Sequence, residues 1–97
     1  MEDKKSYETV IIIKGSYTEK EYQEALDKVK GYMKDLIEIE KVEEMGLRKL
    51  AYEVKKQNVG YYVVIEFKAV SENIRELERI YRINDDILKF IIVRKDD

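Results

Sequence analysis

The sequence contains no cysteine and no histidine among its 97 residues. Without cysteine there is no disulfide, zinc–thiolate site, iron–sulfur cluster or cysteine nucleophile. Without histidine, serine–histidine hydrolysis and imidazole metal sites are excluded as well. No apolar run reaches the length of a membrane span, and the first residues lack the apolar core of a signal peptide. We therefore expect a soluble, cytoplasmic protein without metal, cofactor or small-molecule substrate.

The charge balance is nearly even. Lys and Arg number 19 against 21 Asp and Glu, so the net charge is −2, although 41% of the residues are charged. This mixture argues against a basic nucleic-acid-binding arm. A hydrophobic content of 44% argues against disorder. The length suits one domain over residues 1–97, and no proline, linker or repeat divides it.

Four segments have the character of β-strands. The first contains the β-branched cluster Val10–Ile13, and the second begins with an alternation of apolar and charged residues from Ile37. Gly46 within the second predicts a bulge or a sharp twist, and not the end of the strand. The polar run 55–60 predicts a turn that joins the second and third strands as a hairpin. The strands are expected at residues 6–14, 37–54, 61–68 and 87–94.

Two segments have helical periodicity. Thr18 and Glu21 have the spacing of a capping box, which predicts a helix start. Ser71 is expected to cap the second helix, which ends at Asn84–Asp86. The expected buried stripes are Tyr22, Ala25, Leu26, Val29, Met33 and Leu36 in the first helix and Ile74, Leu77, Ile80 and Tyr81 in the second.

The resulting order, βαββαβ, predicts an α+β fold of the ferredoxin-like type. Right-handed crossovers give a four-stranded antiparallel sheet with strand order 4-1-3-2 and both helices on one face. The second strand then lies at an edge of the sheet.

The sheet face without helices should be wet in such a two-layer fold. Alternation along the strands nevertheless places six apolar side chains on it, which suggests a docking patch. The alternative is an ordinary half-exposed sheet covered by long Lys and Glu side chains. The six residues are Val10, Ile12, Tyr62, Val64, Ile91 and Val93.

Charge is uneven along the second strand. Residues 38–44 are mostly acidic, whereas residues 47–60 are mostly basic and lie beside tyrosines. Such a cluster suits contacts to phosphates and bases. The alternative is a charged edge that prevents strand pairing. The loop 14–17 lacks the arginine that an acylphosphatase-type site needs, and no other catalytic constellation is present, so we expect no enzyme.

The segment 41–56 resembles the signature segment of the bacterial small-subunit ribosomal protein six family. Its core is the run GLRKLAY at residues 46–52. The flanking matches are Tyr7–Glu8, Gly60–Tyr62, Arg82–Asp85 and Val93–Arg94, so the resemblance covers about residues 6–95. It also implies a ferredoxin-like fold.

The resemblance implies a structural component of the small ribosomal subunit in the cytoplasm. It implies binding to the central domain of small-subunit ribosomal RNA together with small-subunit ribosomal protein eighteen, without a catalytic role. The RNA or partner contacts implied by position are Lys5, Arg48, Lys49, Tyr52, Lys56, Tyr61 and Lys89. The alternative function is a ferredoxin-like regulatory or ligand-binding module that acts as a homodimer.

Overall fold

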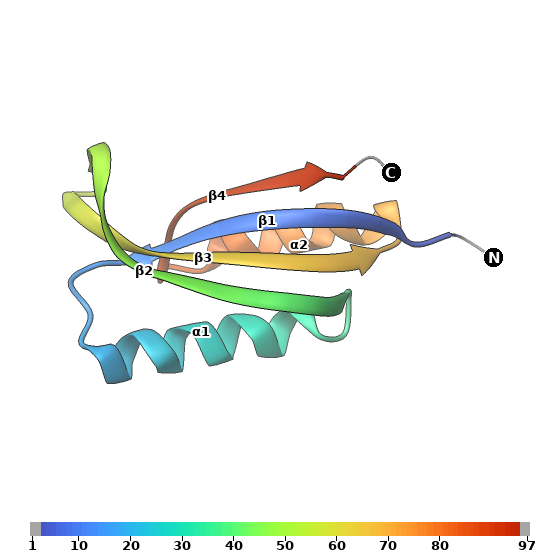
Figure 1. Cartoon of the computed structure of the whole chain (residues 1–97), viewed down its shortest axis with the longest axis horizontal. Helices are drawn as coiled ribbons and strands as arrows, with labels where there is room; N and C mark the ends of the chain where they lie inside the picture. Colours follow the sequence, from blue (N-terminus) through green and yellow to red (C-terminus); the bar gives the residue numbers. More distant parts are fainter. Residues whose placement is uncertain (1–2, 96–97) are drawn as a thin grey trace.

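The computed structural model describes residues 3–95, which form four strands and two helices in the predicted order (Figure 1). The first half of the chain contains β1 (Lys5–Lys14), α1 (Glu19–Met33) and β2 (Glu38–Val54). The second half contains β3 (Gln57–Ala69), α2 (Ser71–Ile83) and β4 (Ile87–Arg94).

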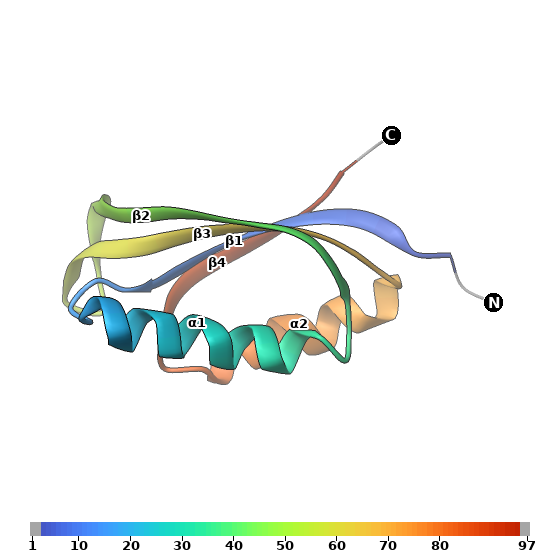
Figure 2. The same cartoon turned by 60° about the horizontal axis from the view of Figure 1, so that its bottom comes forward.

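The sheet is antiparallel and has the order β2-β3-β1-β4. This confirms the predicted order 4-1-3-2, with β2 at an edge. Both helices lie on one side of the sheet, as Figure 2 shows, and the other face carries no helix. The fold is therefore ferredoxin-like, as expected.

The central strand β1 pairs with β3 from Lys5–Ala69 at one end to Lys14–Gly60 at the other. Its start also lies beside the end of β4, where the Lys95 amide donates to the Ser6 carbonyl over 2.9 Å. The two ends of the described chain therefore lie side by side at the same end of the sheet. Neither helix within residues 3–95 is long and apolar enough to cross a membrane.

The start of α1 is the predicted capping box. The Thr18 hydroxyl accepts from the Glu21 amide over 3.2 Å, and the Glu21 carboxylate accepts from the Thr18 amide over 2.8 Å. This satisfies two amides that have no partner within the helix. The expected stripe is buried from Tyr22 to Met33, but Leu36 lies beyond the end of the helix.

The start of α2 differs from the prediction. Val70 occupies the N-cap position, and Ser71 is already the first helical residue, with no capping bond from a side chain. The Asn73 amide donates to the Val70 carbonyl, and the Asn73 side chain donates to the Leu36 carbonyl over 2.8 Å. The predicted role of Ser71 as the cap is therefore wrong. The second bond ties the start of α2 to the loop after α1.

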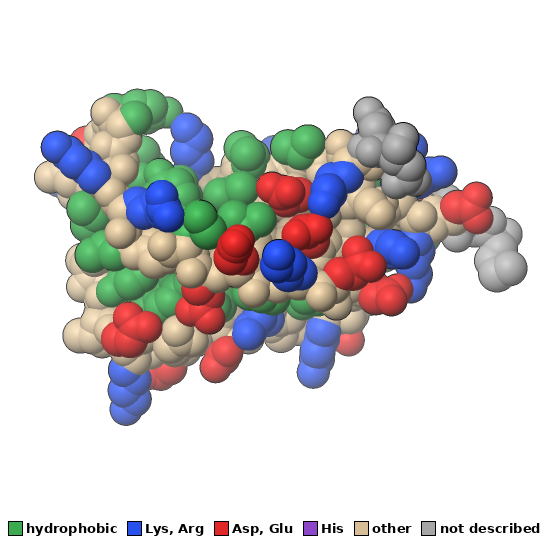
Figure 3. Space-filling model, viewed as in Figure 1, with side chains coloured by type: hydrophobic (Ala, Val, Ile, Leu, Met, Phe, Trp, Pro, Cys, Tyr) green, Lys and Arg blue, Asp and Glu red, His purple; other side chains and the backbone are tan. Residues whose placement is uncertain are grey.

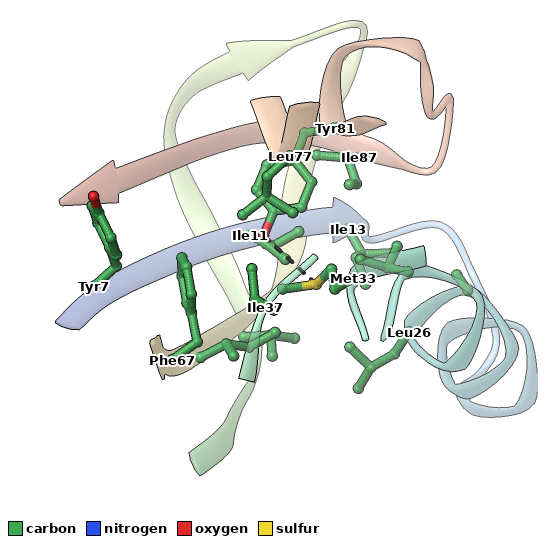
Figure 4. Packing of buried hydrophobic residues seen from close by; sticks show 14 of the residues in the cluster. Tyr7, Ile11, Ile13, Leu26, Met33, Ile37, Phe67, Leu77, Tyr81 and Ile87 are labelled. Carbon is green, nitrogen blue, oxygen red and sulfur yellow. Dashed lines mark hydrogen bonds between the residues drawn. The ribbon is translucent and has the colours of Figure 1, made fainter. Parts of the chain in front are cut away.

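The core lies between the sheet and the helices (Figure 4). Ile11, Leu26, Phe67 and Leu77 are completely buried there, each from a different element. Within this core the Tyr81 hydroxyl lies 3.7 Å from the sulfur of Met33. Burial of large apolar side chains contributes about 1.5–3 kcal/mol each. One continuous core therefore holds both helices on the sheet.

The hairpin between β2 and β3 confirms one expectation and corrects another. Gly46 has φ +87° and lies at a shift of register, so the predicted bulge is present. The predicted turn over residues 55–60 is wrong, because only Lys55 and Lys56 lie between the strands. Both have positive φ, 48° and 65°, as in a type I′ hairpin turn. The remaining residues of the polar run belong to β3.

Candidate functional site

The last part of β2 leaves the plane of the sheet and curls over the face without helices, at the upper left of Figure 1. Lys49 pairs with Val59, and Val54 pairs with Gln57, so five steps along β2 oppose two along β3. The surplus residues of β2 must bow outward. We call residues 50–54 the arm.

A small second core fixes the arm to the sheet. Leu50 packs with Ile12 of β1 and Leu88 of β4, and all three are buried. Gly60 makes this close approach feasible, because a Cβ there would lie 2.4 Å from Cγ2 of Ile12. The basic residues on either side of Leu50 are thereby held on a defined surface, not on a free loop.

Five basic side chains surround the arm and are exposed to solvent. They define the hairpin end of the sheet: Arg48, Lys49, Lys55, Lys56 and Lys89. Within residues 3–95, none of the five forms an ion pair with a carboxylate. Their charge is therefore available to an external anion.

Lys89 links β4 to the arm through Tyr52. Its Nζ donates to the Tyr52 hydroxyl over 2.9 Å and lies 5.1 Å from the centre of the ring. This hydrogen bond lowers the pKa of Tyr52 and raises the pKa of Lys89. The Tyr52 ring remains 63% exposed, so an aromatic surface stands among the cations.

The opposite end of the sheet has similar residues in a different arrangement. Three lysines there pair with glutamates across or beyond neighbouring strands, and we call this the paired end. The pairs are Lys4–Glu38 at 3.1 Å, Lys68–Glu40 at 3.8 Å and Lys95–Glu66 at 2.8 Å. In Figure 3, red and blue side chains alternate over the right-hand part of the molecule, whereas blue ones stand apart around the curled hairpin at the upper left.

The structure brings together five of the seven residues predicted as RNA or partner contacts. Arg48, Lys49, Tyr52, Lys56 and Lys89 all lie at the hairpin end. The sequence alone places the first four near one another, because they belong to one strand and the turn that follows it. The contact of Lys89 with Tyr52 depends on the arm, which the sequence did not reveal.

The other two predicted residues lie elsewhere. Lys5 pairs with Ala69 and lies near the paired end. Tyr61 is on the helix-covered face, where its ring stacks on Tyr22 with 4.2 Å between centroids, and its hydroxyl donates to the Tyr17 carbonyl over 3.1 Å. Neither residue shares the surface of the hairpin end.

The apolar patch predicted on the helix-free face is partly covered. Ile12 is only 8% exposed, because the arm lies over it, whereas Ile91 and Val93 are 51% and 52% exposed. Val10, Tyr62 and Val64 are half-buried. A groove of about 260 Å³ runs between the arm and this face, with Leu50 and Tyr52 on one wall and Val10 and Ile91 on the other.

Sequence reasoning missed the apolar side chains that hold the arm. Leu50 and Leu88 each lie next to a lysine, and the sequence pattern does not assign either of them to a core. The surplus residues of the arm break the alternation along β2, so no regular spacing in the sequence could have revealed this second core.

The chemistry of this surface is recognition of anions and apolar groups. Within residues 3–95 no cluster of three or more carboxylates is arranged to hold a metal ion. The cations are solvated, and the groove beside them is apolar. Such a surface suits a phosphate backbone together with an apolar partner.

Several known proteins of one family are similar to this chain. The family model described as ribosomal protein S6 matches residues 6–94. The chain belongs to the ribosomal protein S6 family. Small ribosomal subunit protein bS6 of Helicobacter hepaticus is 50% identical over 95 residues, which cover 93% of this chain and 66% of the relative. The bS6 protein of Clostridium novyi is 43% identical over 93 residues, which cover 95% and 98% of the two chains.

A solved structure extends the comparison to the fold. The crystal structure of 30S ribosomal protein S6 from Thermotoga maritima has a TM-score of 0.88 at 37% identity and covers 96% of this chain and 89% of that one. Within the S6 family, the chain spans about two thirds of the length of the Helicobacter relatives and nearly all of the Clostridium one. The segment with the GLRKLAY run, from the bulge to the arm, lies inside the matched region.

Proposed function

We propose that this S6-family chain is a structural, non-enzymatic component of the bacterial small ribosomal subunit in the cytoplasm. It binds the central domain of small-subunit ribosomal RNA together with small-subunit ribosomal protein eighteen. The observation that carries this proposal is the group of cations at the hairpin end that form no ion pair within residues 3–95. All of them except Lys89 belong to the segment 41–56 that resembles the family signature.

In this proposal the hairpin end contacts the phosphate backbone. Arg48, Lys49, Lys56 and Lys89 are solvated and form no ion pair within the described residues, so each can neutralise a phosphate and release counterions. Tyr52 offers an exposed ring on which an unpaired base can stack. Lys5 would make a separate contact near the paired end. Tyr61 would act by fixing the loop before α1, because its ring is already stacked.

The apolar groove and the exposed Ile91 and Val93 would hold the protein partner. Interface cores favour apolar and aromatic side chains surrounded by a polar rim. Val10, Val64 and Tyr62 provide such a centre, and Glu8 and Glu66 lie beside it in the next row of the sheet. RNA and partner would thus occupy adjoining parts of one side of the molecule.

The net charge of −2 bears on how the chain would bind RNA. Long-range repulsion from 21 carboxylates opposes binding by the chain alone, so affinity should depend on the basic partner. The experiment is filter binding to the central-domain RNA at fixed salt, with and without protein eighteen. We expect much tighter binding with the partner. Equal affinity in the two cases would contradict the proposed sharing of contacts.

A homodimeric ligand-binding module is the competing function. Sedimentation of the purified chain distinguishes the two functions. A monomer that associates with small ribosomal subunits supports the ribosomal role. A stable dimer that does not associate with small subunits would favour the module. Phosphatase, nuclease and acyl-transfer turnover should stay at background in the same preparations, since the chain has no histidine or cysteine.

A further inference from the structure

A second hollow shares Lys89 and Phe90 with the apolar groove. It has a volume of about 300 Å³ and is bounded by the hairpin turn, the end of α2 and the start of β4. Its three charged lining residues, Lys55, Arg82 and Lys89, come one from each of these elements. Among residues 3–95, no carboxylate lines it. We call this hollow the turn–helix cleft.

Arg82 makes fewer hydrogen bonds to a carboxylate than Arg79, the preceding arginine of α2. Its guanidinium lies 5.9 Å from the centre of the Phe90 ring, and Phe90 also lines the cleft. Its one ion pair, with Glu78, is 3.4 Å long and solvent-exposed. Arg79, in contrast, donates to the Glu76 carboxylate through two nitrogens and does not line the cleft. The two arginines therefore form a natural matched pair.

Lys55 occupies a position that disfavours lysine. Its φ of 48° and the φ of 65° at Lys56 lie in the left-handed region, where hairpin turns prefer Asn-Gly. Two consecutive lysines at such positions are poor choices for folding alone. Residues kept in an unfavourable backbone region often mark a functional site. Here the side chain concerned lines a cleft that contains only basic charges.

We propose that the turn–helix cleft binds a phosphodiester group of RNA through Lys55, Arg82 and Lys89. This inference rests on the proposed function. It adds Lys55 and Arg82 to the phosphate contacts proposed above for Arg48, Lys49, Lys56 and Lys89, with Lys89 shared between the two groups. A guanidinium can hold two phosphate oxygens at once, and an ammonium group donates three hydrogen bonds. Lys89 can therefore keep its bond to Tyr52 and still reach a phosphate.

The position of the cleft constrains the path that the RNA backbone would take. Lys55 lines the turn–helix cleft, whereas Arg48 and Lys49 of β2 and Lys56 of the turn do not. An RNA segment that reaches both groups of cations would have to follow the hairpin turn. Lys55 and Lys56, which are adjacent in sequence, would then contact different phosphates.

The test measures the salt dependence of RNA binding in the presence of protein eighteen, together with the thermal midpoint of each variant. Arg82→Ala should lower the salt slope by about one unit and weaken binding severalfold. Arg82→Lys should retain most of the slope. Arg79→Ala is the matched control from the same helix and should bind like the wild type.

Lys55→Asn separates folding from binding. Asparagine tolerates the left-handed backbone better than lysine, so the thermal midpoint should stay or rise while the salt slope falls by about one unit. If the wild type binds but Arg82→Ala and Lys55→Asn keep its affinity and slope, the cleft is not a phosphate site and the proposed function stands. The inference also fails if Arg79→Ala weakens binding as much as Arg82→Ala. Failure of the wild type to bind would contradict the proposed function itself.

Discussion

The two ends of the sheet use the same residue types for opposite purposes. At the paired end, Lys68 and Lys95 each lie against a glutamate, so their charge is neutralised within the chain. At the hairpin end, Arg48 and Lys49 have no such neighbour within residues 3–95. The acidic residues in 38–44 lie in the first part of β2, and the basic ones in 47–56 lie in its last part and in the turn that follows it. Their separation along β2 therefore separates the two kinds of surface in space.

The comparison shows that net charge is a poor guide to binding. A total of −2 conceals one surface with five cations that form no ion pair within residues 3–95, and another where three lysines are paired with glutamates. Solvent-exposed ion pairs contribute only about 0–1 kcal/mol to stability. The main effect of the ion pairs at the paired end is therefore to neutralise charge on the surface, and their contribution to the stability of the fold is small. What distinguishes the ends is the charge that remains available.

The largest expected effect comes from removing charge at the hairpin end. The triple variant Arg48→Ala, Lys49→Ala, Lys56→Ala should lower the salt slope of RNA binding by roughly three units and weaken binding at least tenfold, an order-of-magnitude expectation. The thermal midpoint should change little, because exposed basic side chains usually alter stability by about 0.5 kcal/mol or less. Filter binding with protein eighteen over a salt series measures both quantities.

The matched control removes three lysines from the paired end: Lys4→Ala, Lys68→Ala, Lys95→Ala. It removes the same number of charges, so it separates position from net charge. We expect near-wild-type affinity and slope. If both triple variants lose binding equally, the distinction between the two ends has no functional meaning.

A smaller effect is expected at the glycine between the two halves of β2. Gly46 has φ +87°, so Gly46→Ala should destabilise the chain by about 1 kcal/mol or more and disturb the register of the basic half. Gly31→Ala is the control, because a Cβ there meets nothing within 4 Å inside a helix. It should stabilise by about 0.5–1 kcal/mol.

Urea denaturation measures both glycine variants, and RNA binding shows whether only the first is impaired. Stabilisation by Gly46→Ala would mean that the bulge does not require a left-handed residue. Unchanged RNA binding in a destabilised Gly46→Ala chain would show that the register of the basic half is set by the arm alone.

The smallest effect concerns the ionisation of two tyrosines. Lys89 lowers the pKa of Tyr52, whereas a hydrogen bond to Asp86, with some burial, raises the pKa of Tyr17 to about 12. Tyr52 should therefore ionise well before Tyr17 in an alkaline titration followed by NMR of the rings. Lys89→Met should raise the pKa of Tyr52, and Asp86→Asn should lower that of Tyr17.

The raised pKa also sets a limit on alkaline stability. Stability linked to the protonated Tyr17 is fully present below its ordinary pKa of 10.0 and is lost as pH rises towards about 12. Asp86→Asn should reduce this loss. Identical alkaline unfolding curves for the wild type and Asp86→Asn would show that the bond does not contribute to it.

Local signals in the sequence predict most of the fold. Thr18 and Glu21 form their capping box because the bonds involve residues three apart. Ser71 shows the limit of such signals, since Val70 takes the N-cap position and the second bond of Asn73 is to the distant Leu36. Lys55 and Lys56 show a second limit of local signals. A turn of two lysines resembles none of the sequences that favour positive φ, so the sequence does not reveal a two-residue turn there.

The candidate site was predictable in composition but not in shape. The cluster of basic residues is visible in the sequence, because β2 keeps neighbours in sequence close together. The arm is not visible in the sequence, because its surplus residues break the alternation by which side chains are assigned to the two faces of the sheet. Tyr61 illustrates the consequence. It is close in sequence to the basic residues, yet its ring packs against Tyr22 on the other face.

The bond between the Lys95 amide and the Ser6 carbonyl has a practical consequence for engineering. Because the beginning of β1 and the end of β4 are neighbours, a short linker could join them and new ends could be opened elsewhere in the chain. A break between Lys55 and Lys56 would yield a circular permutant in which every strand of the sheet keeps its partner. Such a molecule would carry a fluorophore or an affinity tag at the hairpin turn itself, whereas a fusion before β1 or after β4 would leave that surface clear.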